Sequence, residues 1–432
     1  MRPSSLSPPL IEALSPGWHL GSLYTLAMIA VGLVVLVGAA ATARQPNSAV
    51  SASIFYLLLG GLGALAINQL DVTPLDPERD HVLLERLAEL ALIVAVFSAG
   101  LTIERNVRRR SWISIAVLLT VVMPLSILAI AAFGVWAMGL SFGAALLLGA
   151  ILAPTDPVLA GDVGLTGPGG DVLGEPRLSL HTEAGFNDGL ASPFVVLGLL
   201  AATQGGTGWI GSWLVADLLY AAGLALLLGA AAGHVAAFLI TRLRGRDRLP
   251  AELTGVVVLG FVLVLYGLTE ALGCYGLLAV FASGFTFRRF EFDHRIHHSA
   301  HDATEAAGKT LELLVLLMLG TMLTTDGLAA PGVAGWLLAP LLIVVVRPAL
   351  VLTTIGPRAM PARARLFLGF FGVRGVAALF YAAVVAGSGA LDADEQHVVV
   401  WTTLAVVVTS IIVHGLTATS LTRRWLKPGG AE

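Results

Sequence analysis

The chain has 432 residues, of which 56% are hydrophobic and only 12% are charged, and its formal net charge is −3. Soluble globular domains carry about 25% charged residues, so the composition excludes an ordinary cytosolic enzyme and a disordered protein. The lack of a basic surplus excludes a nucleic-acid binder, and a single cysteine, Cys274, excludes a disulfide framework or a thiolate metal cage.

Apolar runs of membrane-spanning length recur along the whole chain, since a transmembrane helix needs about 20 such residues. The first run is too long for the core of a cleaved signal peptide, so we interpret it as the first span. Thirteen spans are predicted, at about 21–43, 49–69, 87–103, 112–138, 141–161, 180–201, 210–240, 253–270, 273–287, 310–325, 332–354, 366–388 and 396–421. The sequence therefore predicts an all-α polytopic membrane protein.

The basic residues predict the orientation of these spans. With thirteen spans, 20 lysines and arginines fall on one side of the membrane and 3 on the other, while Arg347 and Arg374 lie within spans. The positive-inside rule then places the N-terminus outside and the C-terminus in the cytoplasm. Joining 253–287 into one helix would put the later arginines on the wrong side, which favours two spans there. The short tail after Leu421 leads us to expect a single transmembrane domain over 1–432 and no soluble regulatory domain.

The fifth span contains two prolines that bracket a polar pair, Thr155 and Asp156. Each proline removes a backbone donor and clashes with the preceding turn, so the helix is predicted to break between Pro154 and Pro157. A break inside the membrane is tolerated only where it faces protein or a water-filled cavity. Asp156 is expected to cap the second half of this span, and the break is either a simple kink or part of an ion site.

The sixth span carries two acids in the membrane. Glu183 and Asn187 are four residues apart and share one helix face, whereas Ala184 and Asp188 lie on the adjacent face. Arg374 in the twelfth span is the expected counter-charge of Glu183, because a guanidinium can bind a carboxylate in a two-pronged contact. Asp188 is then left to titrate. The alternative is that these polar groups only hold helices together.

The twelfth span is also expected to be interrupted, because Arg374 lies in the run Gly372-Val373-Arg374-Gly375 and glycine weakens a helix. Spans five and twelve run in opposite directions, which gives spans four to six and eleven to thirteen the parity of an inverted repeat. Paired interrupted helices at matching positions indicate a binding site in the middle of the membrane.

Three motifs, in this order, resemble the NhaP-type sodium/proton antiporters of the cation:proton antiporter-1 family. They are Ala153-Pro154-Thr155-Asp156-Pro157, the stretch from Glu183 to Gly189 with its Asn187-Asp188 pair, and Gly372-Val373-Arg374-Gly375. The segment from Thr269 to Gly284 is similar to a further element of that family. The resemblance runs from about the third to the thirteenth span, and the combination of motifs is specific where one alone would be weak.

The resemblance implies a homodimer with an inverted-repeat antiporter fold. Its core bundle is expected at about 112–201 and 332–423, with two crossed interrupted helices, and its dimerisation helices at about 21–103 and 210–325. Asp188 matches the acid that binds cation or proton, Asp156 the acid of the interrupted helix, and Thr155 a neighbour that offers its backbone carbonyl. Na⁺ prefers oxygen ligands, so Asp156 and Asp188 are the expected metal ligands.

The same resemblance assigns Glu183, Asn187 and Arg374 to a structural or gating cluster. Where the family commonly has a serine ligand, this chain has Ala184, so the sequence does not predict whether Na⁺ or K⁺ is preferred. Asn187 stands where electrogenic relatives have a second aspartate. We therefore expect one cation to be exchanged for one proton without net charge movement.

The function implied is exchange of a monovalent cation, Na⁺ or Li⁺, for H⁺ in pH and sodium homeostasis, in a cell inner membrane or plasma membrane. No cofactor, nucleic acid or nucleotide is expected, and the expected partners are a second copy of the chain and membrane lipids. A K⁺/H⁺ antiporter or a potassium efflux protein on the same scaffold is the alternative. The sequence contains no repeated filter sequence, which argues against a channel. It also contains no nucleophile motif, which argues against an intramembrane hydrolase.

Four histidines, His294, His297, His298 and His301, form two pairs at a spacing of four in a predicted cytoplasmic loop. Such pairs could bind a divalent metal or respond to pH, or they could belong to a polar linker, which we favour. Asp217, Glu312 and Arg347 receive no role from the sequence.

Overall fold

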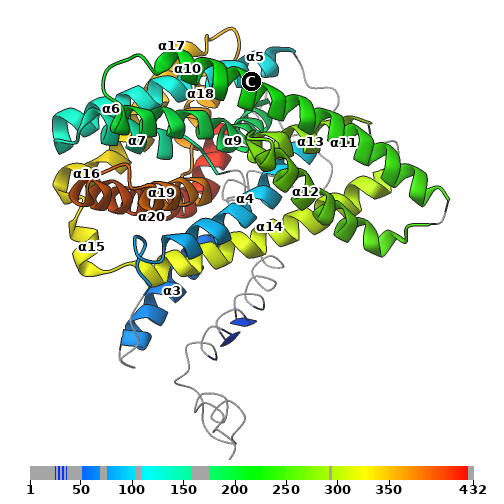
Figure 1. The fold of residues 1–432 in the computed structure, drawn as a ribbon, viewed down its shortest axis with the longest axis horizontal. Coiled ribbons are helices and arrows are strands. Elements are labelled where there is room, and N and C mark those ends of the chain that lie inside the picture. Colours follow the sequence, from blue (N-terminus) through cyan, green and yellow to red (C-terminus); the bar gives the residue numbers. More distant parts are fainter. Residues whose placement is uncertain are drawn as a thin grey trace, which may run out of the picture.

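The computed structural model is helical wherever it is regular (Figure 1), and no strand occurs among its described residues. Those residues are 25, 28, 29, 32, 33 and 36, followed by 51–68, 75–103, 109–156, 175–246, 248–290 and 294–426. The first half of the chain forms α3 (Ala52–Asn68), α4 (His81–Leu101), α5 (Arg109–Val117), η2 (Leu118–Val122), α6 (Met123–Met138), α7 (Phe142–Ile151), α9 (Glu175–Thr203), α10 (Ile210–Trp213), η4 (Leu214–Ala221) and α11 (Ala222–Arg244). The second half forms η5 (Ala251–Leu253), α12 (Thr254–Ala271), α13 (Gly276–Phe290), α14 (His294–Met322), α15 (Thr325–Ala329), α16 (Gly332–Pro340), η6 (Leu341–Val346), α17 (Arg347–Thr354), α18 (Ala362–Phe370), α19 (Val376–Ser388) and α20 (Ala393–Leu426).

The helices coincide in position with the predicted spans from 49–69 onward, which confirms the all-α fold class. Within the described part of the chain, six helical segments are long and apolar enough to cross a membrane: Arg109–Met138, Pro176–Thr203, Ile210–Arg244, Thr254–Ala271, Gly332–Thr354 and Ala393–Ala418. Three further apolar helices are shorter, at Ala52–Leu65, Phe142–Ile151 and Val376–Ser388. Most of the first predicted span, 21–43, lies outside the described residues. The total of thirteen spans and the orientation stay predictions.

The segment 253–287 is two helices, as the charge distribution predicted. The helix α12 ends at Ala271 and α13 begins at Gly276. Between them Gly273 has a φ of 69°, a left-handed conformation that glycine adopts without steric cost. The side chain of Glu270 stabilises the turn, because its Oε1 accepts a hydrogen bond from the backbone N–H of Gly276 at 2.7 Å.

Two helices end where the polar motifs begin. The predicted interruption of the twelfth span is confirmed, and the fifth span leaves its helix as predicted, while its second half lies outside the described residues. The helix α7 ends at Ile151, and residues 154–156 are not helical. The helix α18 ends at Phe370, and residues 372–375 are not helical before α19 starts at Val376. By contrast, α9 runs without interruption from Glu175 to Thr203. The candidate site is therefore formed by two broken spans against one continuous helix.

The helix α4 packs against helices from both halves of the sequence. It contacts α13 and α14 and also α9 and α19, and Figure 1 shows it running alongside α14. Its contact with α13 is made through glycines: a Cβ on Gly100 would lie 2.6 Å from the carbonyl oxygen of Phe281, and one on Gly284 would lie 2.4 Å from that of Phe97. The two backbones therefore touch directly, as is common for small residues between membrane helices.

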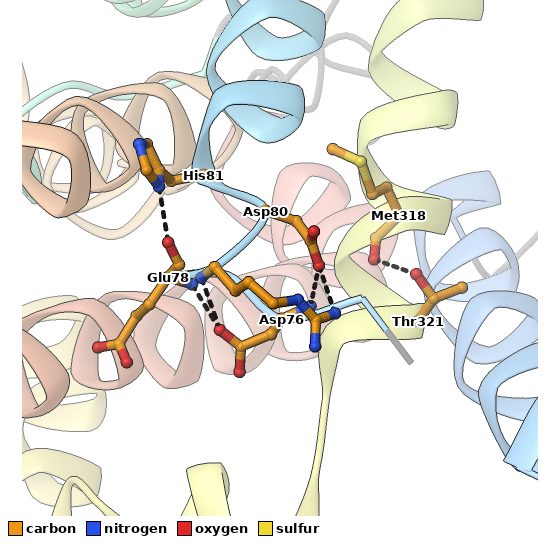
Figure 2. Close-up of polar contacts among 7 residues, drawn as sticks. Asp76, Glu78, Asp80, His81, Met318 and Thr321 are labelled. Carbon is orange, nitrogen blue, oxygen red and sulfur yellow. Dashed lines mark hydrogen bonds and ion pairs between the residues drawn. The ribbon is translucent and has the colours of Figure 1, made fainter. Parts of the chain in front are cut away.

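The turn that precedes α4 is held by its own side chains (Figure 2). Oδ1 of Asp76 accepts hydrogen bonds from the backbone N–H groups of Glu78 and Arg79, at 2.9 and 2.8 Å. Asp80 accepts from the guanidinium of Arg79 at 2.7 Å, and this hydrogen bond lowers the pKa of the Asp80 carboxyl. Glu78 also contacts Nδ1 of His397 in α20 at 3.2 Å. The turn thus connects the start of α4 with the start of α20.

Candidate functional site

The two interrupted spans meet at Asp156. Its backbone N–H donates to the carbonyl of Val373 at 2.8 Å, and its Oδ2 accepts from the N–H of Val376 at 3.0 Å. Val376 is the first residue of α19, so the carboxylate caps this helix at its positive end. The sequence predicted a cap on the second half of Asp156's own span, which lies outside the described residues. The geometry thus adds a role that the sequence did not suggest: Asp156 joins the two breaks.

Asn187 of α9 is bonded to the first break. Its side-chain Oδ1 accepts from the backbone N–H of Thr155 at 3.1 Å, and its Nδ2 donates to the hydroxyl of Thr155 at 2.9 Å. Both residues are buried. The side-chain amide of Asn187 therefore holds the non-helical segment at Thr155 against α9. The family resemblance had placed Asn187 in a cluster with Glu183 and Arg374.

The predicted pairing of Glu183 with Arg374 is wrong. Both carboxylate oxygens of Glu183 accept from Nη2 of Arg347, at 2.8 and 2.6 Å, and both side chains are nearly inaccessible to solvent. Arg347 begins α17 directly after the π-helical turn η6, and its guanidinium packs against Gly372, where a Cβ would lie 2.3 Å from Nε. The missing side chain at Gly372 gives Arg347 the space to reach Glu183 from a third helix.

Arg374 is held by the second break itself. Its Nη1 donates to the carbonyl of Gly372 at 3.0 Å, and its backbone N–H donates to the hydroxyl of Ser410 in α20 at 2.8 Å. Glu183 acts on the guanidinium only through the longer-range Coulomb interaction. Each residue of the predicted cluster thus has its own hydrogen-bond partner: Glu183 binds Arg347, Asn187 binds Thr155, and Arg374 binds the carbonyl of Gly372. The signal for Arg347 was present in the sequence, since it is an arginine inside a span.

Asp188 has the most unusual environment of the site. It is fully buried, and within the described part of the protein neither oxygen of its carboxylate has a hydrogen-bond partner. Its backbone carbonyl accepts from the hydroxyl of Tyr381 in α19, which also contacts the hydroxyl of Ser192 at 2.9 Å. The charge of Asp156 acts on this carboxyl. Burial of a carboxylate without a partner is costly, which makes Asp188 the acid of this site whose environment favours a neutral form.

Asp217 and His301, which the sequence also singled out, make contacts of their own. Tyr275 donates its hydroxyl hydrogen to Asp217 at 2.9 Å, and His301 contacts Glu305 one helical turn further on at 3.2 Å. The side chains of His294, His297 and His298 are outside the described set. Among the residues that are described, no group of three or more histidines, cysteines and acids is arranged to hold a metal ion.

Two non-helical segments that meet beside a buried pair of acids are typical of the interrupted helices of membrane transporters. The chain belongs to the transmembrane sodium/hydrogen exchanger family, which matches residues 25–424. The fold is similar to that of the sodium proton antiporter MjNhaP1 from Methanocaldococcus jannaschii. One structure of it, at pH 8, gives a TM-score of 0.69 at 18% identity over 91% of this chain and all of the other, and an electron-microscopy structure gives 0.74 at 20% over 94% and 100%.

Curated relatives include the Na⁺/H⁺ antiporter 2 of Zygosaccharomyces rouxii, which is 31% identical over 77% of this chain and 42% of its own length. The Na⁺/H⁺ antiporter of Saccharomyces cerevisiae is 29% identical over 79% of this chain and 38% of its own. The K⁺/H⁺ antiporter NhaP of Alkalimonas amylolytica is 24% identical over 93% and 67%. The chain thus spans about two fifths of the yeast relatives it matches. The family resemblance that the motifs suggested is confirmed.

Proposed function

We propose that the chain is a secondary antiporter that exchanges Na⁺ or Li⁺ for H⁺. The observation that carries this proposal is Asp188, a fully buried carboxylate without a hydrogen-bond partner among the described residues, next to the charge of Asp156. Burial favours the protonated form of an acid, and a bound cation favours the ionised form. One group can therefore carry a proton and a cation in turn, which is what exchange through a single site requires.

The ligands proposed for the cation are the carboxylates of Asp188 and Asp156, the backbone carbonyl of Thr155 and water. Oxygen ligands suit a hard monovalent cation. The hydroxyl of Thr155 accepts a hydrogen bond from Asn187, which fixes its orientation beside the proposed site. Ala184 is buried and offers no oxygen, which leaves one position of the coordination shell to water.

The transport cycle we propose is electroneutral, with one cation exchanged for one proton. Asn187 cannot ionise and is bonded to Thr155, so in the Asn187-Asp188 pair only Asp188 changes its protonation state. The core bundle, about 112–201 and 332–423, would carry the occupied site across the membrane against the helices of 21–103 and 210–325. We place the protein as a homodimer in a cell inner membrane or plasma membrane, where it serves pH and sodium homeostasis.

A K⁺/H⁺ antiporter is the second candidate. It is favoured by Ala184, which removes a ligand from the site, and by the similarity to the K⁺/H⁺ antiporter NhaP over 93% of this chain. The same site and the same titration of Asp188 would serve either cation.

The test uses purified protein in proteoliposomes with a trapped pH dye, challenged with Na⁺, Li⁺ and K⁺ in turn. We expect proton flux that depends on the imposed cation gradient and is largest for Na⁺ or Li⁺. Flux with K⁺ alone would replace the first proposal by the second. Protein that is folded and inserted but gives no cation-dependent flux above empty liposomes would overturn both.

A further inference from the structure

Two side chains of α20 reach the second interruption from outside the ion site. Ser410 and His414 are one helical turn apart and both fully buried. The hydroxyl of Ser410 accepts from the backbone N–H of Arg374 at 2.8 Å, and His414 Nε2 lies 2.8 Å from the carbonyl oxygen of Phe370. Phe370 is the last residue of α18, so the two contacts lie on either side of the break.

Both ring nitrogens of His414 lie 2.8 Å from a backbone carbonyl oxygen, Nε2 from that of Phe370 and Nδ1 from that of Ser410 in its own helix. A carbonyl oxygen can only accept, and a neutral ring carries one hydrogen, so it donates to one of these two carbonyls at a time. The contact with Phe370 is made by the tautomer that carries the hydrogen on Nε2. Two guanidinium groups, of Arg374 and Arg347, act electrostatically on the ring, and Glu183 faces the same two arginines. A neutral ring avoids a third positive charge there.

Two contacts therefore hold the two sides of the break. The backbone N–H of Arg374 donates to the hydroxyl of Ser410, and Nε2 of His414 faces the carbonyl of Phe370. An interrupted helix leaves such N–H and C=O groups without intrahelical partners, and inside a membrane each of them needs one. The rings of Phe370 and Phe371 also pack on His414, at centroid distances of 5.2 and 5.9 Å.

We propose that Ser410 and His414 form a clamp on the second break and are positioning residues for the ion site. The clamp fixes Phe370 and Arg374, and two residues later the N–H of Val376 binds Asp156. Loss of the clamp would therefore displace the proposed ligand Asp156 without removing any group that contacts the cation. The effect on transport rests on the proposed function, whereas the effect on the break does not.

The first measurement is hydrogen exchange of peptides that cover 370–376 in lipid nanodiscs. Ser410→Ala removes the acceptor of the Arg374 N–H, and we expect this amide to exchange about fivefold to tenfold faster, the change that one hydrogen bond provides. The matched control is Thr409→Val, because the hydroxyl of Thr409 bonds only the carbonyl of Ala405 in its own helix. Equal exchange of the break in both variants would overturn the clamp.

The second measurement is cation-driven proton flux. In Ser410→Ala we expect the apparent KM for Na⁺ to rise at least about threefold with a smaller change in maximal rate, and the control to be unchanged. His414→Phe keeps the ring volume and should act like Ser410→Ala, whereas His414→Gln retains a donor for Phe370 and should recover part of the affinity. If His414→Phe fails to fold, Ser410→Ala alone decides.

The outcomes separate the two proposals. Faster exchange of the break with an unchanged KM would show that Ser410 and His414 only stabilise the helix, and it would overturn their positioning role. Wild-type protein that gives no cation-driven flux would refute antiport, while the exchange measurement would still accept or reject the clamp.

Discussion

Asp188 combines full burial with a carboxylate that has no hydrogen-bond partner within the described structure. Other acids of the site do not share this state, because Glu183 is paired with Arg347 and Asp156 accepts from the amide of Val376. We base the proposed roles on this difference. An acid with a permanent protein partner has little reason to bind and release a proton, whereas a proton or a cation would supply the partner that Asp188 lacks among the described residues.

We predict that Asp188→Asn abolishes exchange. The amide keeps the shape of the side chain but can neither ionise nor carry the proton, so cation-driven flux should fall to the level of empty liposomes. The thermal unfolding temperature should stay equal to or above that of the wild type, since an isolated buried acid is replaced by a neutral group. Appreciable Na⁺-driven flux in this variant would remove Asp188 from the site.

For Glu183 and Arg347 we predict energetic coupling. Glu183→Gln or Arg347→Gln alone leaves one buried charge without its partner, at a cost of about 3–5 kcal/mol. The double variant should recover a large part of this loss, because no orphan charge remains. The measurement is a double-mutant cycle on thermal unfolding in detergent. The cycle of Glu183 with Arg374 is the comparison and should show weaker coupling, since no hydrogen bond joins these two side chains. Equal coupling in both cycles would contradict the assignment.

At the scale of elements, the site depends on where helices stop. The break in the fifth span is fixed by Pro154, which precedes Thr155, and the break in the twelfth by the glycines on either side of Val373 and Arg374. The non-helical segments of the two breaks then bond to each other, since the backbone N–H of Asp156 donates to the carbonyl of Val373. The break in the fifth span offers the carboxylate of Asp156. The break in the twelfth span offers the start of α19, whose first N–H groups have no partner within their own helix.

Asp156 serves as both a cap and a proposed ligand, and two substitutions separate the functions. Asp156→Asn should lower exchange severely but change stability little, because asparagine caps helices about as well as aspartate. Asp156→Ala should lower exchange equally and also cost about 0.5–2 kcal/mol of stability. The paired readout is proton flux and thermal unfolding of the same samples. Exchange that survives in Asp156→Asn would restrict Asp156 to capping.

The breaks were predictable from sequence, and their partners were not. Prolines and glycines disrupt a helix through local backbone chemistry, so Pro154 and Gly372 indicate an interruption without any knowledge of neighbours. The partner of Glu183 depends instead on which distant helix lies opposite. Two arginines were inside spans, and Arg374 was predicted as the partner because a guanidinium can bind a carboxylate in a two-pronged contact. That chemistry is common to both arginines, and Arg347 makes the contact. In the same way, only the tertiary structure shows that Asn187 binds Thr155 and that Ser410 and His414 reach the second break.

At the scale of the whole molecule, the net charge moved across the membrane in the proposed transport cycle depends on residue 187. A second acid at position 187 would add a titrating group beside Asp188, but Asn187 has an amide, which does not ionise and which hydrogen-bonds Thr155. The protein as a whole should therefore move no net charge when it exchanges one cation for one proton.

The corresponding prediction is that membrane potential does not affect transport. Proteoliposomes with equal K⁺ on both sides should show the same Na⁺-driven proton flux with and without valinomycin. A diffusion potential of either sign, imposed with unequal K⁺, should neither drive nor stall exchange. A rate that follows the imposed potential would contradict the electroneutral cycle and would require a second charge-carrying group in the protein.

The glycine contact between α4 and α13 has a consequence for mutational tolerance. A methyl group at Gly100 or Gly284 would overlap a carbonyl oxygen of the opposite helix, and backbone atoms cannot rotate away as a side chain can. Even alanine, the smallest possible replacement, should therefore be rejected at both positions, although neither lies in the ion site. A saturation-mutagenesis map of the chain would show intolerance at these glycines comparable to that at Asp188. Such a map, used alone to search for functional residues, would not distinguish these packing glycines from residues of the proposed ion site.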